Sequence, residues 1–569
     1  MKAKSTITLL FVLASTLLWV TAGNAQFLTV LNSNVPAGFG QAGYIQTATL
    51  GSDGGGTLVM NGITMIVPAN SVVQFPANTL KWADLFAPNV NTTPVYDPGV
   101  PTEPNLSITC TPPALKCTGL ALLDNFAQTV GQSPYLPFNA NVLGNIDTKN
   151  VTGLGVNTYI VGLILPIGQD LGNGGAGVIT FIDYAKGRFE VGGQLNTPGT
   201  GTVIEINDPS GRYGFAHSPD PRWTVDPDNP SVAAGNGYPM CIPRIAPPKI
   251  DLSCPLFNRP LNPSGAGQDP FLQPGAPLMV VNMPPSAKPG TTKPDPWKEA
   301  PFMIGDFVAY AGVMYKNDPS APIDPTKPWN QQTYISANTV GADKVALYTA
   351  PCASGKENCT SSVGPAYMQL ARMVIGTGGA TPGTNVLPNA NLGITGGQIP
   401  LPEPKNNIVI TGFVTDSTQL VDIFAADIDP NNGNETPRLL GTVLPEPGVV
   451  VGGVGRGNKG RFRFEVGKGS FGNRTRVYLA QSHHGMVQVP NQHGTIHPKG
   501  GLISGQYHAP MFTFFFPDAP PGFPIIPQNF DSMPFLTQGE GGNPSAGPLS
   551  PFPPYCPVSG SPPLPTCQP

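Results

Sequence analysis

Residues 157–213 constrain the fold most strongly, because short β-type runs alternate there with turn residues. The runs at 158–166, 178–184, 188–191 and 202–206 are rich in Val, Ile, Leu, Phe and Tyr. Gly, Asn, Asp and Pro separate these runs, and no sustained 3.6-residue apolar period is present. Strands of about 5–7 residues between such turns predict antiparallel hairpins. We expect them to close into a small barrel or to form half of a sandwich.

Composition extends this expectation to the whole chain of 569 residues, which is long enough for several domains. Its 69 Gly and 69 Pro make up close to a quarter of the residues, while 40% of the residues are apolar. We therefore predict an all-β protein with several small antiparallel barrels or sandwiches, joined by Pro/Gly-rich linkers. Only 11% of the residues are charged and the net charge is −4, so we expect no nucleic-acid partner.

The first 25 residues have the pattern of an export signal. Lys2 and Lys4 precede an apolar run at 7–20, and Gly23-Asn24-Ala25 supplies small residues for cleavage before Gln26. A membrane anchor is the alternative, but the apolar run is short for a membrane span. No second apolar run of about 18 residues follows. We expect a secreted or cell-envelope protein with no transmembrane segment in its mature chain.

The eight cysteines fall into four pairs that are close in the sequence. An even number, an export signal and short spacings predict four disulfides, each closing a loop, although eight cysteines allow about 105 pairings. No pair has the Cys-x2-Cys spacing of a zinc knuckle, so zinc binding by cysteine is the less favoured alternative. The pairs are Cys110 and Cys117, Cys241 and Cys254, Cys352 and Cys359, and Cys556 and Cys567.

The order of patterned and Pro-rich segments predicts the domain organisation. We expect a signal peptide at 1–25, an N-terminal β-hairpin region and loop at 26–145, a central β module at 146–245, a Pro-rich linker at 246–300, a second β module at 301–380, a linker at 381–404, an immunoglobulin-like sandwich at 405–482, and a His-rich then Pro/Gly-rich region at 483–569. Five evenly spaced β-type runs between 407 and 480 indicate the immunoglobulin-like module. Asn61-Gly62 predicts a type I′ turn within the N-terminal hairpin.

Several segments resemble those of a group of uncharacterised exported β-rich proteins of bacteria and fungi. They read GGTLVMNGITMIVPANSVVQFPA, ITFIDYAKGRFEVGG, INDPSGRYG, NGYPMCIPR and VDIFAADIDPNNGNETPRLLGT. These segments lie in the N-terminal hairpin region, around residues 157–213 and in the third module. The resemblance implies no activity, and we transfer no functional residue from it.

A run of acidic and amide residues is one candidate metal site. Calcium binds about six to eight oxygen atoms from a flexible loop, and a D-x-D-x-N run supplies several of them. The segment departs from the helix-loop-helix calcium motif, because Arg438 occupies the twelfth position. We favour a hairpin loop whose Asp and Asn side chains bond to the backbone. The candidate calcium ligands are Asp427, Asp429, Asn431 and Glu435.

Five of the six histidines are gathered in one C-terminal stretch and form a second candidate site, for zinc or copper. His493 and His497 have i,i+4 spacing, but the neighbouring Gly494 and Pro498 disfavour a helix there. A solvated polar loop is the favoured interpretation, with packing at a strand edge as an alternative for the last of them. The five are His483, His484, His493, His497 and His508.

No catalytic motif is present, and the chain has no G-x-S-x-G elbow, P-loop or H-E-x-x-H motif. Four carboxylates near the central strands are candidates for glycoside chemistry, but outward positions on strands explain them better. They are Asp183, Glu190, Glu205 and Asp208. We therefore predict a secreted, non-catalytic structural or adhesive protein with an unidentified protein or glycan partner and no cofactor. The alternatives are an extracellular protein that binds calcium or a transition metal, and an extracellular enzyme that acts on polysaccharide.

Overall fold

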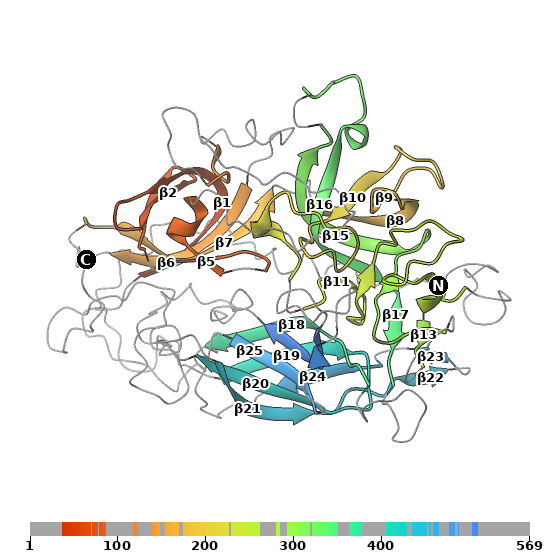
Figure 1. The fold of residues 1–569 in the computed structure, drawn as a ribbon. Helices are drawn as coiled ribbons and strands as arrows, with labels where there is room; N and C mark the ends of the chain where they lie inside the picture. Colours follow the sequence, from red (N-terminus) through yellow and green to blue (C-terminus); the bar gives the residue numbers. More distant parts are fainter. Residues whose placement is uncertain are drawn as a thin grey trace, which may run out of the picture.

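The chain folds almost entirely into β-strands. The computed structural model describes residues 37–69, 71–77, 79–86, 118–122, 138–147, 154–169, 174–226, 229–261, 280–284, 293–318, 321–350, 364–377, 406–428, 435–451, 454–456, 459–465, 477–483, 487–488 and 503–509. Within these ranges there are strands and short 3-10 helices but no α-helix. The main sheets form three groups, which contain β1 to β7, β8 to β16 and β18 to β28 (Figure 1). The predicted all-β class is confirmed.

The first group is a barrel of five strands that closes on itself. Antiparallel pairs join β1 to β2, β2 to β3, β1 to β6 and β6 to β7, and a parallel pair between β3 and β7 closes the circuit. Two short strands extend it from β7, and the 3-10 helix η2 (Trp82–Phe86) follows them. The strands are β1 (Ala37–Leu50), β2 (Gly56–Met60), β3 (Ile63–Val67), β4 (Val72–Gln74), β5 (Thr79–Lys81), β6 (Phe138–Asp147) and β7 (Thr158–Gln169).

The β2–β3 hairpin of this first barrel shows how local sequence sets the register. Asn61 and Gly62 have φ values of 51° and 75°, as the two central residues of a type I′ turn require. Met60 therefore pairs with Ile63. Alternate side chains point into the barrel, so Leu58 and Met65 are fully buried. The predicted turn is confirmed.

The second barrel repeats the same circuit with different strands. Antiparallel pairs join β8 to β9, β9 to β10, β8 to β15 and β15 to β16, and the parallel pair between β10 and β16 closes it. β11 pairs in parallel with β16, as β4 does with β7 in the first barrel. Both barrels thus have one five-strand order and one additional parallel strand. The strands are β8 (Gly174–Asp183), β9 (Arg188–Val191), β10 (Thr202–Ile206), β11 (Val232–Ala234), β15 (Phe307–Lys316) and β16 (Thr333–Asp343).

A long connection, residues 207–306, links the third and fourth strands of the second barrel, and we call it the insertion. In its described residues the main chain pairs in short pieces, which include β12 with β14, and β13 with β17, a strand that follows β16. Residues from the insertion, such as Tyr213, Met240 and Phe302, are buried in the core of the second barrel. The short elements are η5 (Pro221–Trp223), β12 (Met240–Cys241), η6 (Leu256–Asn258), β13 (Val280–Asn282), β14 (Ala300–Pro301) and β17 (Ala346–Tyr348).

The third group consists of two facing sheets that share one apolar core. One sheet has the order β18-β19-β24 and the other β21-β20-β25-β28. Ile410 and Phe462 from the first sheet meet Ile423 and Tyr478 from the second in the core. The strands are β18 (Met368–Thr377), β19 (Asn406–Val414), β20 (Val421–Ile428), β21 (Glu435–Val443), β24 (Arg461–Glu465), β25 (Val477–Ser482) and β28 (Gln506–Ala509), with the small pairs β22 (Val449–Val451) with β23 (Val454–Arg456) and β26 (Val487–Gln488) with β27 (Ile503–Ser504).

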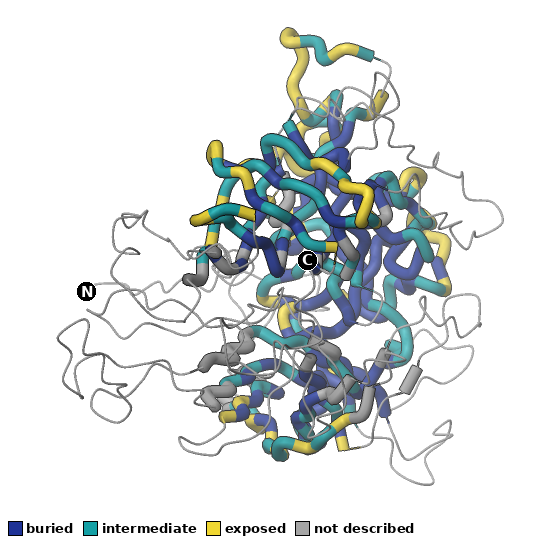
Figure 2. Tube along the Cα trace, turned by 90° about the vertical axis from the view of Figure 1, so that its left-hand side faces the viewer, coloured by how far each residue is buried: buried dark blue, intermediate teal, exposed yellow. Residues whose placement is uncertain are grey.

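The three groups contact one another through buried aromatic side chains. Trp223 from the insertion packs against Phe75 of the first barrel, with ring centroids 5.1 Å apart. Tyr238 from the insertion packs against Tyr367, which directly precedes β18, also at 5.1 Å. Buried residues run through all three groups and exposed ones lie mainly at turns (Figure 2).

The sheets group the chain differently from the expected domain order. The patterned stretch 157–213 is divided, because β7 belongs to the first barrel and β8, β9 and β10 to the second. The expected modules at 146–245 and 301–380 share one sheet, since β15 pairs with β8 from Phe307↔Val178 to Ala311↔Gly174. β18, expected in the 301–380 module, pairs with β19 of the third group. Local patterning identifies strands, whereas the pairs between β8 and β15 join residues more than a hundred positions apart.

Candidate functional site

A loop closed by a disulfide is the most sharply defined feature on the insertion. Cys241 and Cys254 are bonded, with an S–S distance of 2.04 Å and Cα atoms 5.9 Å apart. This pairing was predicted from the sequence and is confirmed. We call residues 241–254 the disulfide loop. The six other cysteines, Cys110, Cys117, Cys352, Cys359, Cys556 and Cys567, lie outside the described residues, and their pairing stays a prediction.

An ion pair inside the disulfide loop fixes its shape. The Arg244 guanidinium donates from Nε and Nη2 to the two carboxylate oxygens of Asp251, each at 3.1 Å, and the Arg244 amide donates to the same carboxylate at 3.0 Å. Burial raises the pKa of Asp251, but these hydrogen bonds from Arg244 outweigh it and the net pKa is lowered. From outside the loop, Lys298 Nζ donates to the carbonyl of Leu252 at 2.6 Å. The loop is thus held by a covalent bond, by an ion pair within it and by a lysine from outside it.

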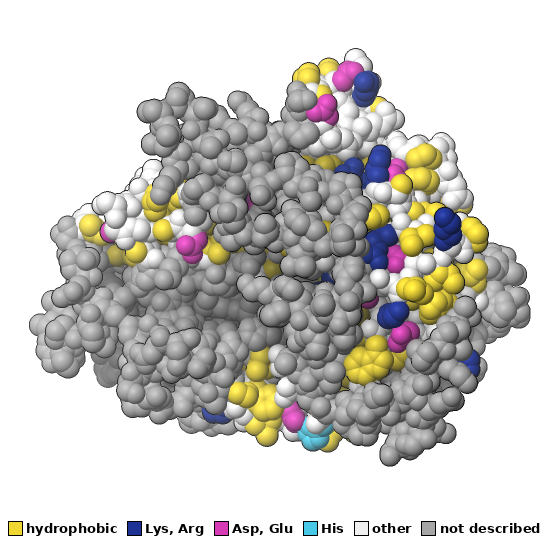
Figure 3. Space-filling model, viewed as in Figure 1, with side chains coloured by type: hydrophobic (Ala, Val, Ile, Leu, Met, Phe, Trp, Pro, Cys, Tyr) yellow, Lys and Arg dark blue, Asp and Glu magenta, His cyan; other side chains and the backbone are white. Residues whose placement is uncertain are grey.

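The tip of the disulfide loop is apolar and faces solvent. Residues 245–250 are exposed, and Leu252 is 68% exposed. Among these residues Ile245, Ile250 and Leu252 are the large apolar side chains, and Lys249 is the charged one. Figure 3 shows hydrophobic side chains gathered with scattered charges over the second barrel and the insertion. A rigid loop that exposes apolar side chains has the properties of a contact surface.

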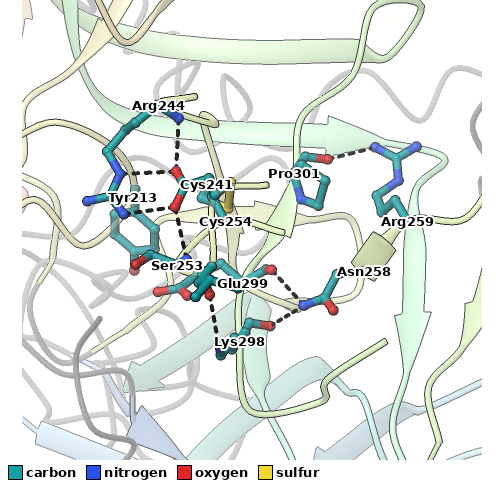
Figure 4. Close-up of a disulfide and its surroundings, with 12 residues drawn as sticks. Tyr213, Cys241, Arg244, Ser253, Cys254, Asn258, Arg259, Lys298, Glu299 and Pro301 are labelled. Atoms are coloured by element: carbon teal, nitrogen blue, oxygen red, sulfur yellow. Dashed lines mark hydrogen bonds and ion pairs between the residues drawn. A yellow bond between two sulfur atoms is a disulfide. The ribbon is translucent and has the colours of Figure 1, made fainter. Parts of the chain in front are cut away.

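Beneath the disulfide loop lies Glu299, near the Cys241–Cys254 bond (Figure 4). Tyr213, Tyr238 and Tyr367 are buried and interact electrostatically with it. Burial raises the pKa of Glu299 to about 7, with the Asp208 carboxylate acting in the same direction and Arg212 and Arg244 opposing it. Burial likewise raises the pKa of Tyr213 to about 12. Glu299 is therefore about half protonated at neutral pH and more fully protonated below it, while Tyr213 keeps its proton.

The four carboxylates considered for glycoside chemistry are engaged in structural contacts, and three of them are buried. Glu190 accepts hydrogen bonds from the amides of residues 199–201. Glu205 bonds to Arg188 at 2.6 Å, and Asp208 accepts from the amides of Ser210 and Tyr213. We expected outward positions, which is wrong for these three, because their strand ends are covered by the insertion and by neighbouring loops. Asp183 is partly exposed and accepts from turn amides.

Two other loops of the second barrel are joined at one end of it, and we call residues 192–201 and 321–332 the platform loops. Asn330 Nδ2 donates to the carbonyls of Gly199 and Gly201, at 3.0 and 2.9 Å. Within the longer loop, the Gln332 amide bonds to the backbone N and O of Asp324 at 2.7 and 2.9 Å. The 3-10 helix η7 (Trp329–Gln331) lies at the end of this loop. Both loops are therefore ordered by side-chain hydrogen bonds, although they face solvent.

The histidine site is placed only in part. His483 follows β25, and its Nε2 lies 3.0 Å from Asp422 Oδ1 on β20. His508 is in β28, where it pairs with Leu479 through the backbone. His484, His493 and His497 lie outside the described residues. In the part of the chain that the structure describes, no three His, Cys, Asp or Glu side chains are grouped as a metal requires. The histidine site stays a prediction.

The acidic candidate site lies where β20 and β21 meet. Asp427 pairs with Thr436 and Ile428 pairs with Glu435, so Asp427 and Glu435 flank one hairpin connection. Asp429 and Asn431 fall outside the described residues. The flanking strands pair as a hairpin, but residues 429–434 lie outside the described residues, so both the side-chain bonding that we favour and calcium binding stay predictions.

The apolar tip of the disulfide loop and the platform loops were not predicted from the sequence. The first has a signal in the run IPRIAPPKIDLSC, in which apolar and Pro residues fill a loop bounded by cysteines. The platform loops have a weaker sequence signal, a Trp followed by three amide residues at 329–332. Neither pattern shows which residues are exposed.

In the ranges given above, no helix is long and apolar enough to cross a membrane. We compared the chain with protein-family models, with curated proteins and with solved structures, and none of the three comparisons found a match.

Proposed function

We propose that this chain is an exported, non-catalytic protein of the cell envelope or extracellular space, and that it binds a surface partner through the disulfide loop. The observation that carries the proposal is the exposure of Ile245, Ile250 and Leu252 on a crosslinked loop. Ordering a flexible loop on binding lowers affinity, whereas a loop already ordered by folding avoids this cost.

The carboxylates of the second barrel support a non-catalytic role. A general acid or base needs a carboxyl group that reaches the substrate. Glu190, Glu205 and Asp208 are buried and hydrogen-bonded to backbone amides or to arginine. Their positions are those of groups that hold loops in place.

We further propose that the third group of strands is an immunoglobulin-like sandwich. Its seven main strands divide into facing sheets of three and four strands around one core. In this respect it is similar to the constant-type immunoglobulin architecture. It differs in one strand, because β21 pairs with β20 and not with β24. Such modules commonly act as spacers and binding units at cell surfaces, and the resemblance to exported β-rich proteins of bacteria and fungi is in keeping with this role.

The test compares binding of purified protein to the surface of the cells that export it. In the test variant, Ile245→Ser, Ile250→Ser and Leu252→Ser are combined, while both cysteines and Arg244 are kept. The control variant carries Leu439→Ser and Leu444→Ser, which are also exposed but lie on the sandwich. We expect the test variant to bind at least about tenfold more weakly, since apolar anchors dominate such contacts, and the control to bind as the wild type does. If the test variant binds as well as the wild type, the disulfide loop is not the binding surface. If the wild type does not bind the cells, the proposed surface-binding function is wrong.

A further inference from the structure

The platform loops expose an aromatic ring and an aliphatic side chain that the fold does not use. Trp329 is 48% exposed and Leu195 is 62% exposed. Two other tryptophans, Trp82 and Trp223, are buried in the apolar core of the first barrel. Trp329 therefore differs from them in presenting a large part of its indole to solvent.

The position of Trp329 is fixed by the residues next to it. Its carbonyl accepts a hydrogen bond from Thr333 Oγ1 at 2.8 Å, and the neighbouring Asn330 bonds the other platform loop. That second loop is held from below by the Glu190 carboxylate, which accepts from three successive amides at 2.7 to 3.1 Å. A buried carboxylate and two amide side chains thus order a surface that contributes little to the core. Such order in an exposed loop is expected where the loop binds a ligand.

The exposed side chains of the platform loops are mostly polar, and their few charges balance. Exposed side chains on the shorter platform loop include Gln194, Asn196 and Thr197, and Gln331 is exposed on the longer one. Amides and hydroxyls both donate and accept hydrogen bonds, as sugar hydroxyl groups do. The charged residues of the longer loop and its base are Lys316, Lys327, Asp318 and Asp324, two of each sign, so their charges cancel.

We propose that the platform loops form a binding site for a neutral polysaccharide, with a sugar ring lying on the indole of Trp329. An indole face offers an apolar surface of the size of a pyranose ring, and exposed amides such as that of Gln331 on the same loop can exchange hydrogen bonds with sugar hydroxyl groups. The cancelled charge disfavours anionic glycans and anionic lipid surfaces, which basic clusters attract. The site is separate from the disulfide loop and does not depend on the function proposed for that loop.

The experiment measures depletion of the purified full-length chain by insoluble cellulose and chitin, and titration with soluble β-1,3-glucan and mannan. Alginate and heparin serve as anionic probes. Tryptophan fluorescence supplies a second readout, because a sugar covering Trp329 shifts its emission, and Trp329→Ala separates this signal from that of the half-buried Trp297. We expect binding to at least one neutral glycan, with an affinity that changes little between low and high salt.

Four variants test the geometry. Trp329→Ala should weaken binding about tenfold or more and abolish the fluorescence shift, and Trp329→Tyr should retain most of the affinity. Asn330→Ala keeps the indole ring of Trp329 but removes the hydrogen bonds that join the two loops. We therefore expect a smaller loss of glycan affinity and an unchanged order of preference among the glycans. Leu439→Ala, an exposed apolar residue on the sandwich, is the matched control. Thermal melting of each variant checks the fold, and Trp329→Ala should lose little stability because Trp329 is 48% exposed and lies outside the core.

Three results would overturn the proposal. The first is that no neutral glycan of the panel binds. The second is unchanged binding by a folded Trp329→Ala variant. The third is a preference for alginate or heparin that disappears at high salt, which would indicate a charge-based surface elsewhere.

Discussion

The two barrels have the same strand circuit but differ in what they bury. The first barrel buries few polar side chains. They are Ser71 and Thr118, counted over its described residues and those of the connection after its third strand. The second barrel and its insertion bury several ion pairs, among them Arg259 with Asp306. An apolar interior is therefore sufficient for this barrel to close. The buried charges of the second barrel stabilise the long connection that is inserted into it.

The insertion explains where those charges are needed. It crosses the second barrel with little regular pairing, so its backbone groups need other partners when buried. Asn258 illustrates this, because its side-chain amide donates to the carbonyl of Glu299 at 2.9 Å and its Oδ1 accepts from the amide of Asp295 at 2.8 Å. Buried polar side chains thus replace the sheet hydrogen bonds that the first barrel makes through its strands.

The largest effect is expected from breaking the Arg259–Asp306 pair. The two side chains are 0% and 2% exposed and share two hydrogen bonds, at 2.5 and 2.9 Å. Arg259→Met leaves the Asp306 carboxylate buried without its cation, which should cost about 3–5 kcal/mol of unfolding free energy. Denaturant unfolding measures the loss.

The double variant Arg259→Met/Asp306→Leu is the control for this prediction. Replacing both charges by apolar groups should restore most of the stability, because no unpaired charge remains. If the double variant is as unstable as Arg259→Met, the pair acts through its shape or through the other contacts of Arg259, such as the Pro301 carbonyl at 3.2 Å, and not through its charge.

A second difference between the barrels is the pH dependence of stability, because Glu299 lies in the insertion of the second barrel. The pKa of Glu299 is raised by burial from 4.5 to about 7, so the folded state holds a proton that the unfolded chain releases near 4.5. The contribution of Glu299 to stability is therefore largest below about pH 4.5 and decreases as the pH rises to about 7. Glu299→Gln removes this dependence and should raise stability by about 2–3 kcal/mol at pH 8, but little at pH 4.5.

Thermal melting at pH 5, 7 and 8.5 tests the assignment to Glu299. Glu465→Gln, at a side chain that is 51% exposed and paired with Arg463, is the matched control and should leave the pH profile unchanged. A wild-type melting temperature that does not fall between pH 5 and 8.5 would contradict the prediction.

Local sequence predicted the strands well and the sheets poorly. The runs at 188–191 and 202–206 became β9 and β10 with the expected bounds, because alternating side chains and flanking glycines determine them. The circuit of each barrel depends on pairs such as Ile204 with Ile335, and nothing in either segment identifies its partner. The same limit applies to function, since the exposure of Ile250 and Trp329 depends on contacts made by distant residues.

The smallest effect tests how each barrel sets the register of its second hairpin. In the first barrel the two-residue turn at Asn61-Gly62 does so through backbone conformation, whereas in the second barrel Glu190 holds the longer loop at 192–201. A methyl group on Gly62 would meet no atom within 4 Å, so Gly62→Ala tests the positive φ of 75° alone. We expect a loss of about 1 kcal/mol, measured by denaturant unfolding and by faster hydrogen exchange of the β2–β3 amides.

Gly341→Ala on β16 is the matched control, because its added methyl group also meets nothing within 4 Å and its φ lies outside the left-handed region. It should change stability by less than about 0.5 kcal/mol. If both variants lose the same amount, the hairpin of the first barrel does not depend on its turn. The contrast between a register set by backbone conformation and one set by a buried carboxylate would then be lost.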